Sequence, residues 1–414
     1  MKQANGKWVT GNNFWGRESD KKILTRKIDE GGHILLTAQR RMGKTSLMKE
    51  LQRILMDRYL CIYVDLQDDS SAEDAIVAIS LELRDHEGLW GKVGRIFSNF
   101  IPQLLDKIEE INLSEIGIKL RSALSSANWQ EKGDRLFDFL AESERPVLLM
   151  MDEFPILINR ILVDEEFKPR ANGRENADTF LSWLRKNGNK HQDKIRIILS
   201  GSIGLEPILR RAGLSATANT YPPFELKPWD RETAIGCLQA LAREYNLIFH
   251  DQAEAAMVDR LGYCIPHHVQ MFFSHVLDYC DRRGKKEFQA AEVDEVYNRE
   301  MLSVRGHAEM SHYEERLKSV LGPELFSFAL ELLTETACAG SLSAKALKSL
   351  TRFYNFSSAT ADSATKEVML VLEHDGYLKP SEEGYVFIST LLKDWWQARH
   401  GFGYIPILKR GIQS

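Results

Sequence analysis

The segment that most constrains the fold is 38–46, with the sequence AQRRMGKTS. It follows an apolar run at 33–39 and opens a segment with helical periodicity. A loop between a buried strand and a helix turns its backbone N–H groups inward, and the helix N-terminus adds the positive end of a dipole, so such a loop suits phosphate. The segment matches the Walker A pattern except that Ala38 replaces the first glycine. We therefore expect an α/β fold with a phosphate-binding loop.

Within this loop the residue types fit a nucleotide with magnesium. Lys44 supplies a cation for the β- and γ-phosphates, and the Thr45 hydroxyl is a ligand for Mg²⁺. Gly43 permits close approach of the backbone. The alternative is a chance Gly-Lys-Thr at a helix start, which the flanking strand and helix disfavour. The remaining loop residues expected at the nucleotide are Arg40, Arg41, Met42 and Ser46.

A second motif is acidic. The run 145–154 is almost continuously apolar and ends in Asp152 and Glu153. This is the Walker B arrangement, in which Asp152 holds the Mg²⁺ shell and Glu153 polarises the attacking water. The alternative is an acidic strand end that faces solvent.

Further apolar runs predict the rest of the sheet. They lie at 60–67, 194–202 and 220–228, and a long stretch from about 71 to 141, which includes 101–108, is mostly helical in character. Strands that are apolar on both faces and alternate with helices predict a parallel sheet covered on both sides. We expect an α/β nucleotide-binding core over 1–228.

Beyond this core the strand signals vanish. Segment 229–308 has the periodicity of amphipathic helices and predicts a helical lid. Segment 309–400 predicts several helices, two short strands around a Pro-Ser-Glu-Glu-Gly turn and a closing helix with Trp395 and Trp396, which together suggest a winged helix. We expect the two tryptophans in the core rather than on an interaction surface. The tail, 401–414, would be able to dock onto a partner if it were disordered.

Several motifs together resemble the archaeal-type AAA+/STAND P-loop ATPases, a group related to the origin-recognition-type AAA+ proteins. They are FWGRE (14–18), AQRRMGKTSL, LLMMDEF, IILSGS, HYEERL (312–317), and LEHDGYL with YVFISTLLKDWW. The resemblance covers nearly the whole chain. It implies ATP or ADP with Mg²⁺ as ligands, and hydrolysis of ATP.

The resemblance also implies further site residues, each with an ordinary structural alternative. Ser200 and Ser202 are sensor-1 candidates, or a simple strand-to-loop turn. Pro266 resembles the lid proline that packs on adenine; the alternative is that it only starts a helix. An obvious sensor-2 arginine is lacking, so His267 or His268 would have to replace it. The candidates for wrapping adenine are Phe14, Trp15, Gly16 and Arg17, and their alternative is a hydrophobic staple before a helix. The arginine-finger candidates are Arg210 and Arg211, with Arg185 next, and their alternative is an ordinary surface position.

Charge and cysteine content limit the other possibilities. The net charge is −5, which gives no global attraction to nucleic acid or anionic membranes. Eleven basic against thirteen acidic side chains from Glu309 onward weaken the case for a DNA-binding winged helix, although Lys345, Lys348 and Arg352 form a small basic group. Five cysteines without CxxC spacing, no signal peptide and no apolar run long enough to span a bilayer predict a cytoplasmic protein.

Three functions therefore remain open. The first is an ATPase switch that controls partner binding or self-association. The second is a DNA-binding AAA+ ATPase, such as a loader or a mobile-element or defence factor. The third is a nucleotide-binding scaffold that does not hydrolyse ATP.

Overall fold

The computed structural model describes two compact units. The residues described are 1–4, 6–97, 113–214, 221–354, 356 and 361–410. Unit 1 comprises 1–16, 39–43 and 227–414, and unit 2 comprises 17–38 and 44–226. The predicted helical run at 101–108 and residues 411–414 of the predicted tail lie outside the described residues. Among the helices described, none is both long enough and apolar enough to cross a membrane.

Unit 2 is built on a five-stranded parallel sheet of order β2-β3-β4-β1-β5. β3 and β4 are buried along their whole length, as continuous apolar runs in a sheet covered on both faces should be. The register pairs Asp65 with Asp152 and Leu36 with Ser200, so polar residues gather at the carboxyl edge. The predicted parallel sheet is confirmed; its strands are β1 (Ile34–Thr37), β2 (Leu60–Asp65), β3 (Val147–Asp152), β4 (Ile195–Ser200) and β5 (Pro223–Glu225).

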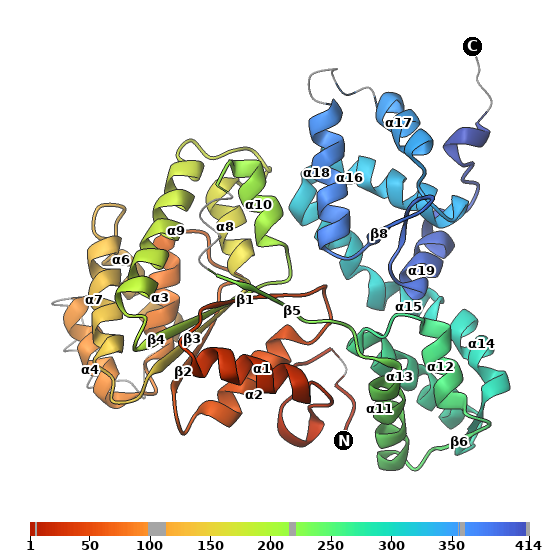
Figure 1. Ribbon diagram of the computed structural model, residues 1–414, viewed down its shortest axis with the longest axis horizontal. Helices are drawn as coiled ribbons and strands as arrows, with labels where there is room; N and C mark the ends of the chain where they lie inside the picture. The colour runs from red at the N-terminus through yellow and green to blue at the C-terminus, as the bar shows by residue number, and fades with distance from the viewer. Residues whose placement is uncertain (5, 98–112, 215–220, 355, 357–360, 411–414) are drawn as a thin grey trace. The chain divides into compact units, whose positions relative to one another are not determined.

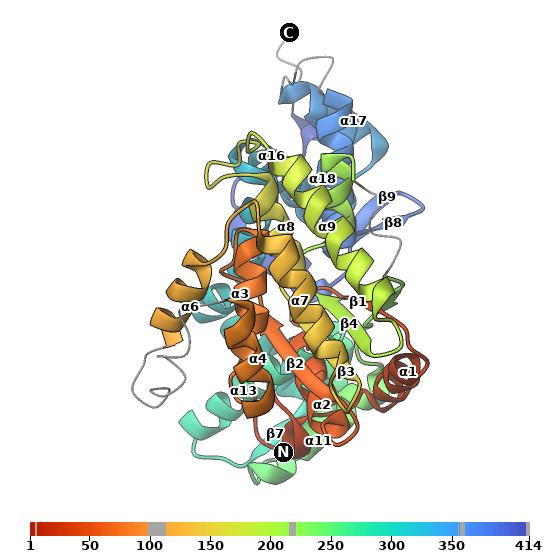
Figure 2. The ribbon, with the colours of Figure 1, turned by 90° about the vertical axis from the view of Figure 1, so that its left-hand side faces the viewer.

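Helices cover both faces of this sheet. The chain moves one way across the sheet from β1 to β2 and the other way from β2 through β3 to β4, so right-handed crossovers place α2 opposite the later helices. Figure 1 shows α1 and α2 together on one side, and Figure 2 shows α7 between α3 and α9 on the other. The helices are α1 (Glu18–Asp29), α2 (Lys44–Leu55), α3 (Ala72–Glu82), α4 (Glu87–Ile96), α6 (Leu113–Ser122), α7 (Trp129–Ala141), α8 (Phe154–Leu162), α9 (Gly173–Lys190) and α10 (Leu205–Ala212).

Unit 1 is mostly helical. It also contains a two-stranded parallel sheet of β6 (Ile248–His250) and β7 (Glu287–Gln289), which the sequence did not predict. Each strand has three residues, too few to show an alternating pattern. The helical segments up to residue 310 are η1 (Gly11–Asn13), α11 (Arg231–Glu244), α12 (Ala253–Leu261), α13 (Pro266–Arg282), η3 (Ala290–Glu292), α14 (Val293–Val296), the π-helical η4 (Tyr297–Met301) and α15 (Val304–Met310).

The C-terminal part of unit 1 has three helices, an antiparallel hairpin and a closing helix. Trp395 and Trp396 on the closing helix are fully buried, so they belong to the core. Arg316 and Asp375, from two motifs 59 residues apart, form a buried ion pair with Nε 3.4 Å from Oδ2. The winged-helix assignment stays a prediction. The elements are α16 (His312–Ala339, broken at Gly322), α17 (Ala344–Phe353), α18 (Ala361–His374), β8 (Leu378–Ser381), β9 (Gly384–Phe387), α19 (Thr390–His400) and η5 (Ile407–Lys409).

The described part of the tail is docked on α16. The Tyr404 hydroxyl lies 3.0 Å from Glu331 and 2.9 Å from Glu335 and shares its single proton between them. The Ile407 N–H donates to the same Glu335 oxygen at 2.9 Å. Arg410 pairs with Glu331 at 2.7 Å. Glu335 is only 1% exposed, so these donors satisfy a buried carboxylate.

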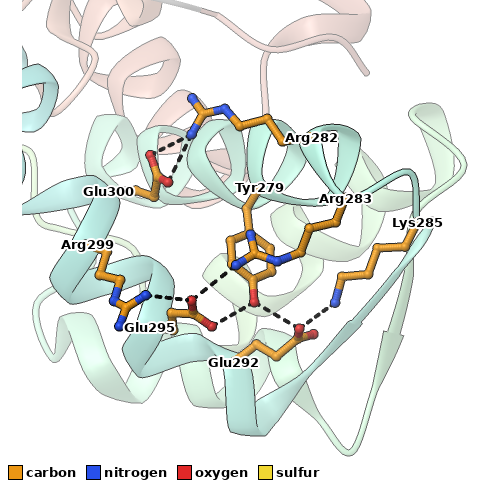
Figure 3. A network of polar contacts seen from close by, with 8 residues as sticks. All are labelled: Tyr279, Arg282, Arg283, Lys285, Glu292, Glu295, Arg299 and Glu300. Atoms are coloured by element: carbon orange, nitrogen blue, oxygen red, sulfur yellow. Dashed lines mark hydrogen bonds and ion pairs between the residues drawn. The ribbon is translucent and has the colours of Figure 1, made fainter.

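A network of polar contacts joins α13 to the segments that follow it (Figure 3). The Tyr279 hydroxyl lies 3.0 Å from the Glu292 carboxylate and 2.8 Å from the Glu295 carboxylate, so its single proton is shared between two acceptors. The Arg283 guanidinium lies 3.6 Å from the centroid of the Tyr279 ring. Tyr279 is 3% exposed, whereas Arg299, which also pairs with Glu295, is largely exposed. The buried tyrosine is therefore the centre of this network.

We predict that Tyr279→Phe lowers the free energy of unfolding by about 1–2 kcal/mol, because the two carboxylates lose the one donor that they share while the ring is kept. Arg299→Gln is the matched control and should change it by less than about 0.5 kcal/mol, since exposed ion pairs contribute little. Urea unfolding of the two variants measures the difference. Equal effects would contradict the central place of Tyr279.

Candidate functional site

The loop between β1 and α2 has the backbone that anion binding requires. Arg41 and Gly43 have φ of 69° and 89°, and α2 begins at Lys44. A helix N-terminus after such a turn presents unpaired N–H groups. The Lys44 side chain is buried, and its ammonium donates to the Ala38 carbonyl at 2.7 Å. The ammonium is thus folded back along the loop, where phosphate oxygens would compete with the carbonyl for it.

Thr45 and Asp152 meet in unit 2. The Thr45 hydroxyl, at the start of α2, donates to Asp152 Oδ2 at 2.8 Å, although the two residues are 107 positions apart in the sequence. Asp152 ends β3 and is only 3% exposed. Its other oxygen, Oδ1, accepts the Glu153 backbone N–H at 3.0 Å. The two motifs predicted from the sequence therefore lie in contact.

Glu153 has a strained and well-held position. It adopts a left-handed conformation, with φ of 54°, directly before α8, and such conformations in non-glycine residues concentrate at functional sites. Its Oε2 accepts the Ser202 backbone N–H at 2.8 Å and the Ser202 hydroxyl at 2.6 Å. A Cβ on Gly201 would lie 2.4 Å from Pro155, so glycine is required for this close approach.

Ser200 differs from Ser202. It ends β4, is completely buried, and its hydroxyl has no hydrogen-bond partner among the residues that the structure describes. A buried hydroxyl without a partner costs free energy, so this hydroxyl at the carboxyl edge of the sheet is a candidate ligand contact. This places a polar group at the sheet edge that also carries Asp152.

The residues present fit a magnesium–nucleotide. Mg²⁺ prefers oxygen ligands and is commonly held by one or two carboxylates together with substrate phosphates and water. Thr45 and Asp152 would supply the hydroxyl and the carboxylate, and Lys44 the cation for phosphate. The unmet Ser200 hydroxyl fits a phosphate oxygen or a water molecule beside it.

Two residues at this site were not predicted. The Tyr63 hydroxyl, on β2, donates to Asp152 Oδ2 at 2.9 Å, and the Lys49 ammonium lies 3.4 Å from the centroid of the Tyr63 ring. Burial, and then the Asp152 charge, raise the pKa of Tyr63 well above its usual value, so the phenol stays protonated. The only sequence signal was a polar aromatic residue in a mostly apolar strand.

The arginine-finger candidates on α10 are already engaged. Arg210 pairs with Glu206 at 2.5 Å, one turn earlier on the helix. Arg211 donates to the Asn159 side chain of α8 at 2.5 Å. The role of these arginines, and of Arg185 on α9, stays a prediction.

The adenine candidates divide between the units. In unit 1, the Trp15 indole donates to the Thr233 carbonyl at 2.9 Å, and a Cβ on Gly16 would lie 2.9 Å from the Thr233 side chain. In unit 2, Arg17 precedes α1 and pairs with Asp20 at 3.3 Å. These contacts hold the segment in place, and contact with adenine stays a proposal. Unit 1 also contains Phe14, Arg40, Arg41, Met42, Gly43 and the buried Pro266 at the start of α13.

The histidines that follow Pro266 are buried too. Burial, reinforced by the nearby Arg41 charge, lowers the pKa of His267 to about 4. The pKa of His268, which is fully buried, is lowered by the same causes with His267 added. Both imidazoles are therefore neutral at pH 7. A cationic sensor-2 role for either histidine would require a change in its surroundings.

Comparison with known proteins identifies the fold. No protein-family model and no curated protein matches the sequence. A Walker-type ATPase of Pyrococcus abyssi matches with a TM-score of 0.60 and 17% identity over 94% of this chain and 98% of that one. The ORC2 protein of Aeropyrum pernix, in ADPNP and ADP complexes, matches with a TM-score of 0.52 and 12% identity over 96% and 98%. The chain has a P-loop NTPase fold of the AAA+ type.

At this site we predict opposite effects of Ser200→Ala on stability and on turnover. The free energy of unfolding should stay unchanged or rise, because an unmet buried hydroxyl is removed. ATP turnover should fall by about tenfold or more, the expected loss of a hydrogen bond to a charged group. Thermal unfolding and a phosphate-release assay measure the two. A variant that is destabilised but equally active would show that the hydroxyl is structural.

Proposed function

We propose that this protein binds ATP with Mg²⁺, hydrolyses it, and uses its nucleotide state to control binding to a protein partner or to further copies of itself. The observation that carries the proposal is the 2.8 Å contact between the Thr45 hydroxyl and the Asp152 carboxylate at the start of α2. It joins Thr45, just after the phosphate-binding loop, to a buried acid, and both residues belong to unit 2. The P-loop fold is consistent with this role.

Binding would rest on the loop and on Lys44. The positive-φ residues Arg41 and Gly43 turn the backbone, and the N-terminus of α2 favours negative charge. Lys44 would exchange the Ala38 carbonyl for phosphate oxygens, which bind an ammonium more strongly because they are charged. A magnesium ion held by Thr45 and Asp152 would neutralise charge on the phosphates.

Hydrolysis would rest on Glu153. A carboxylate at this position accepts a proton from water and orients the water for attack. Ser202 holds Oε2 through two hydrogen bonds, which fixes the direction of the carboxylate and leaves further lone pairs for water. The Ser200 hydroxyl would then donate to the terminal phosphate or to the water. Adenine contact is assigned to Phe14, Trp15, Gly16, Arg17 and Pro266, and a finger role to Arg210 or Arg211.

The switch role concerns unit 1. Its helical segments 229–308 would act as the lid and 309–400 as a winged helix that carries the change to a partner. We place the protein in the cytoplasm, where ATP is available and where its five cysteines, all free thiols in the structure, would stay reduced.

We predict that Glu153→Gln lowers steady-state ATP turnover by about 100-fold or more, because general-base catalysis contributes about 10² to 10⁴. Affinity for ATP should stay within about threefold, since the carboxylate acts on water and not on the nucleotide. Phosphate release and equilibrium binding, each with and without duplex DNA, measure these effects. Binding without turnover in the unmodified protein would leave the scaffold function.

A DNA-binding ATPase is the second candidate, and one observation favours it. Lys345, Lys348 and Arg352 are exposed along α17 at helical spacing, so they form one basic stripe. Lysine and arginine contacts to phosphate supply most nonspecific affinity. Against this, α18 carries Lys366 together with Glu367 and Glu373. We therefore rank DNA binding below a protein partner.

Because we rank DNA binding second, we predict that ATP turnover does not respond to duplex DNA at about 150 mM salt, near physiological ionic strength. If the protein does bind DNA, changing Lys345, Lys348 and Arg352 to glutamine should weaken binding and reduce the salt slope by about three, one for each cationic side chain removed from phosphate. Fluorescence anisotropy at several salt concentrations measures both. DNA-stimulated turnover that this triple variant abolishes would make DNA the ligand.

A further inference from the structure

Tyr63 reaches the Asp152 carboxylate across the sheet. The register of β2 and β3 pairs Tyr63 with Met150 and Asp65 with Asp152, so all four side chains share one face. The tyrosine is long enough to extend one further residue pair along this face. Its hydroxyl lies 2.9 Å from Asp152 Oδ2, the same oxygen that Thr45 contacts at 2.8 Å.

Lys49 holds the ring of this tyrosine. Lys49 lies one turn after Thr45 on α2, and its ammonium is 3.4 Å from the centroid of the Tyr63 ring. A cation over an aromatic face is attracted by the ring electrons, more strongly when partly buried. The two α2 residues therefore act on one assembly, Thr45 on the carboxylate and Lys49 on the tyrosine that also contacts it.

The carboxylate needs these donors because it is buried. Asp152 is 3% exposed, and an ionised carboxylate out of water is costly unless hydrogen bonds satisfy it. Thr45 has a single hydroxyl. If that hydroxyl turns its lone pairs to a magnesium ion, its proton still has to point away from the ion, and the geometry of its bond to Asp152 changes. The Tyr63 hydroxyl is not a candidate magnesium ligand, so it can keep donating to Asp152.

We infer that Tyr63 is a positioning residue for magnesium, which keeps the Asp152 carboxylate facing the start of α2 whatever the Thr45 hydroxyl binds. This inference rests on the proposed function, because it assigns a role within the same magnesium–nucleotide site. Tyr63 touches neither phosphate nor the reacting water in this role; it acts through Asp152. Its contribution is to the response to magnesium rather than to nucleotide binding as such.

The experiment compares Tyr63→Phe with Tyr59→Phe, both in a Glu153→Gln background so that nucleotide is not consumed. Tyr59, just before β2, is a matched control because its hydroxyl donates to the Asp29 carboxylate at 2.8 Å and lies outside the site. Binding of a fluorescent ATP analogue is followed while MgCl₂ is titrated, and again in EDTA. Circular dichroism and thermal unfolding check that each variant is folded.

For Tyr63→Phe we expect the magnesium concentration at half-effect to rise by about tenfold or more, the loss of one hydrogen bond to a charged group. Affinity in EDTA should stay within about twofold of the parent, because Tyr63 does not touch the nucleotide. Tyr59→Phe should shift neither quantity.

Two results would overturn the inference, and they differ from each other. An unchanged magnesium midpoint in folded Tyr63→Phe, with a clear magnesium response in the parent, would remove the role of Tyr63 alone. A parent that binds no nucleotide, or that binds it equally with and without magnesium, would remove the proposed function and the inference with it. An equal shift in Tyr59→Phe would make the effect one of general stability and would also contradict the inference.

Discussion

The carboxylate of Asp152, buried at the end of β3, is the constraint on which the site depends. A buried carboxylate requires hydrogen-bond donors, and those of Asp152 come from α2, from β2 and from the backbone of Glu153, the residue before α8. Each of these segments is thereby held at one edge of the sheet. The same demand explains why Thr45 and Asp152, far apart in sequence, meet so closely. Satisfying one charge in this way prepares the oxygen ligands that Mg²⁺ prefers.

Much of the α/β core follows from hydrophobic pattern alone. β3 and β4 are runs of six buried residues, and strands that are apolar on both faces are typical of a parallel sheet covered on both sides. The phosphate-binding loop was predictable for a different reason. Gly43, Lys44 and Thr45, placed between a strand and a helix, match the Walker A pattern. The short strands β6 and β7 were not predictable, because three residues carry no periodicity and Ile248 is exposed.

The side-chain partners within the site could not be predicted from the sequence. Ser200 and Ser202 look alike in the motif, yet one hydroxyl binds Glu153 and the other is buried without a described partner. That difference depends on how the backbone packs after β4, where Gly201 lies so close to Pro155 that an added Cβ would be 2.4 Å from its ring. Tyr63 was missed because its contact with Asp152 depends on the β2–β3 register. Position along a strand predicts a face, whereas a hydrogen bond also requires the neighbouring strand.

The docked tail changes what counts as the end of unit 1. Tyr404 and Ile407 both donate to Glu335, a carboxylate that lies inside α16 and is almost wholly shielded from water. A chain that stopped at Gly401 would keep every helix from α11 to α19 and would still leave this acid without those two donors. Shortening the protein to its last helix would therefore remove part of the hydrogen bonding of its interior. The ten residues after α19 belong to the folded unit as fully as the helix on which they lie.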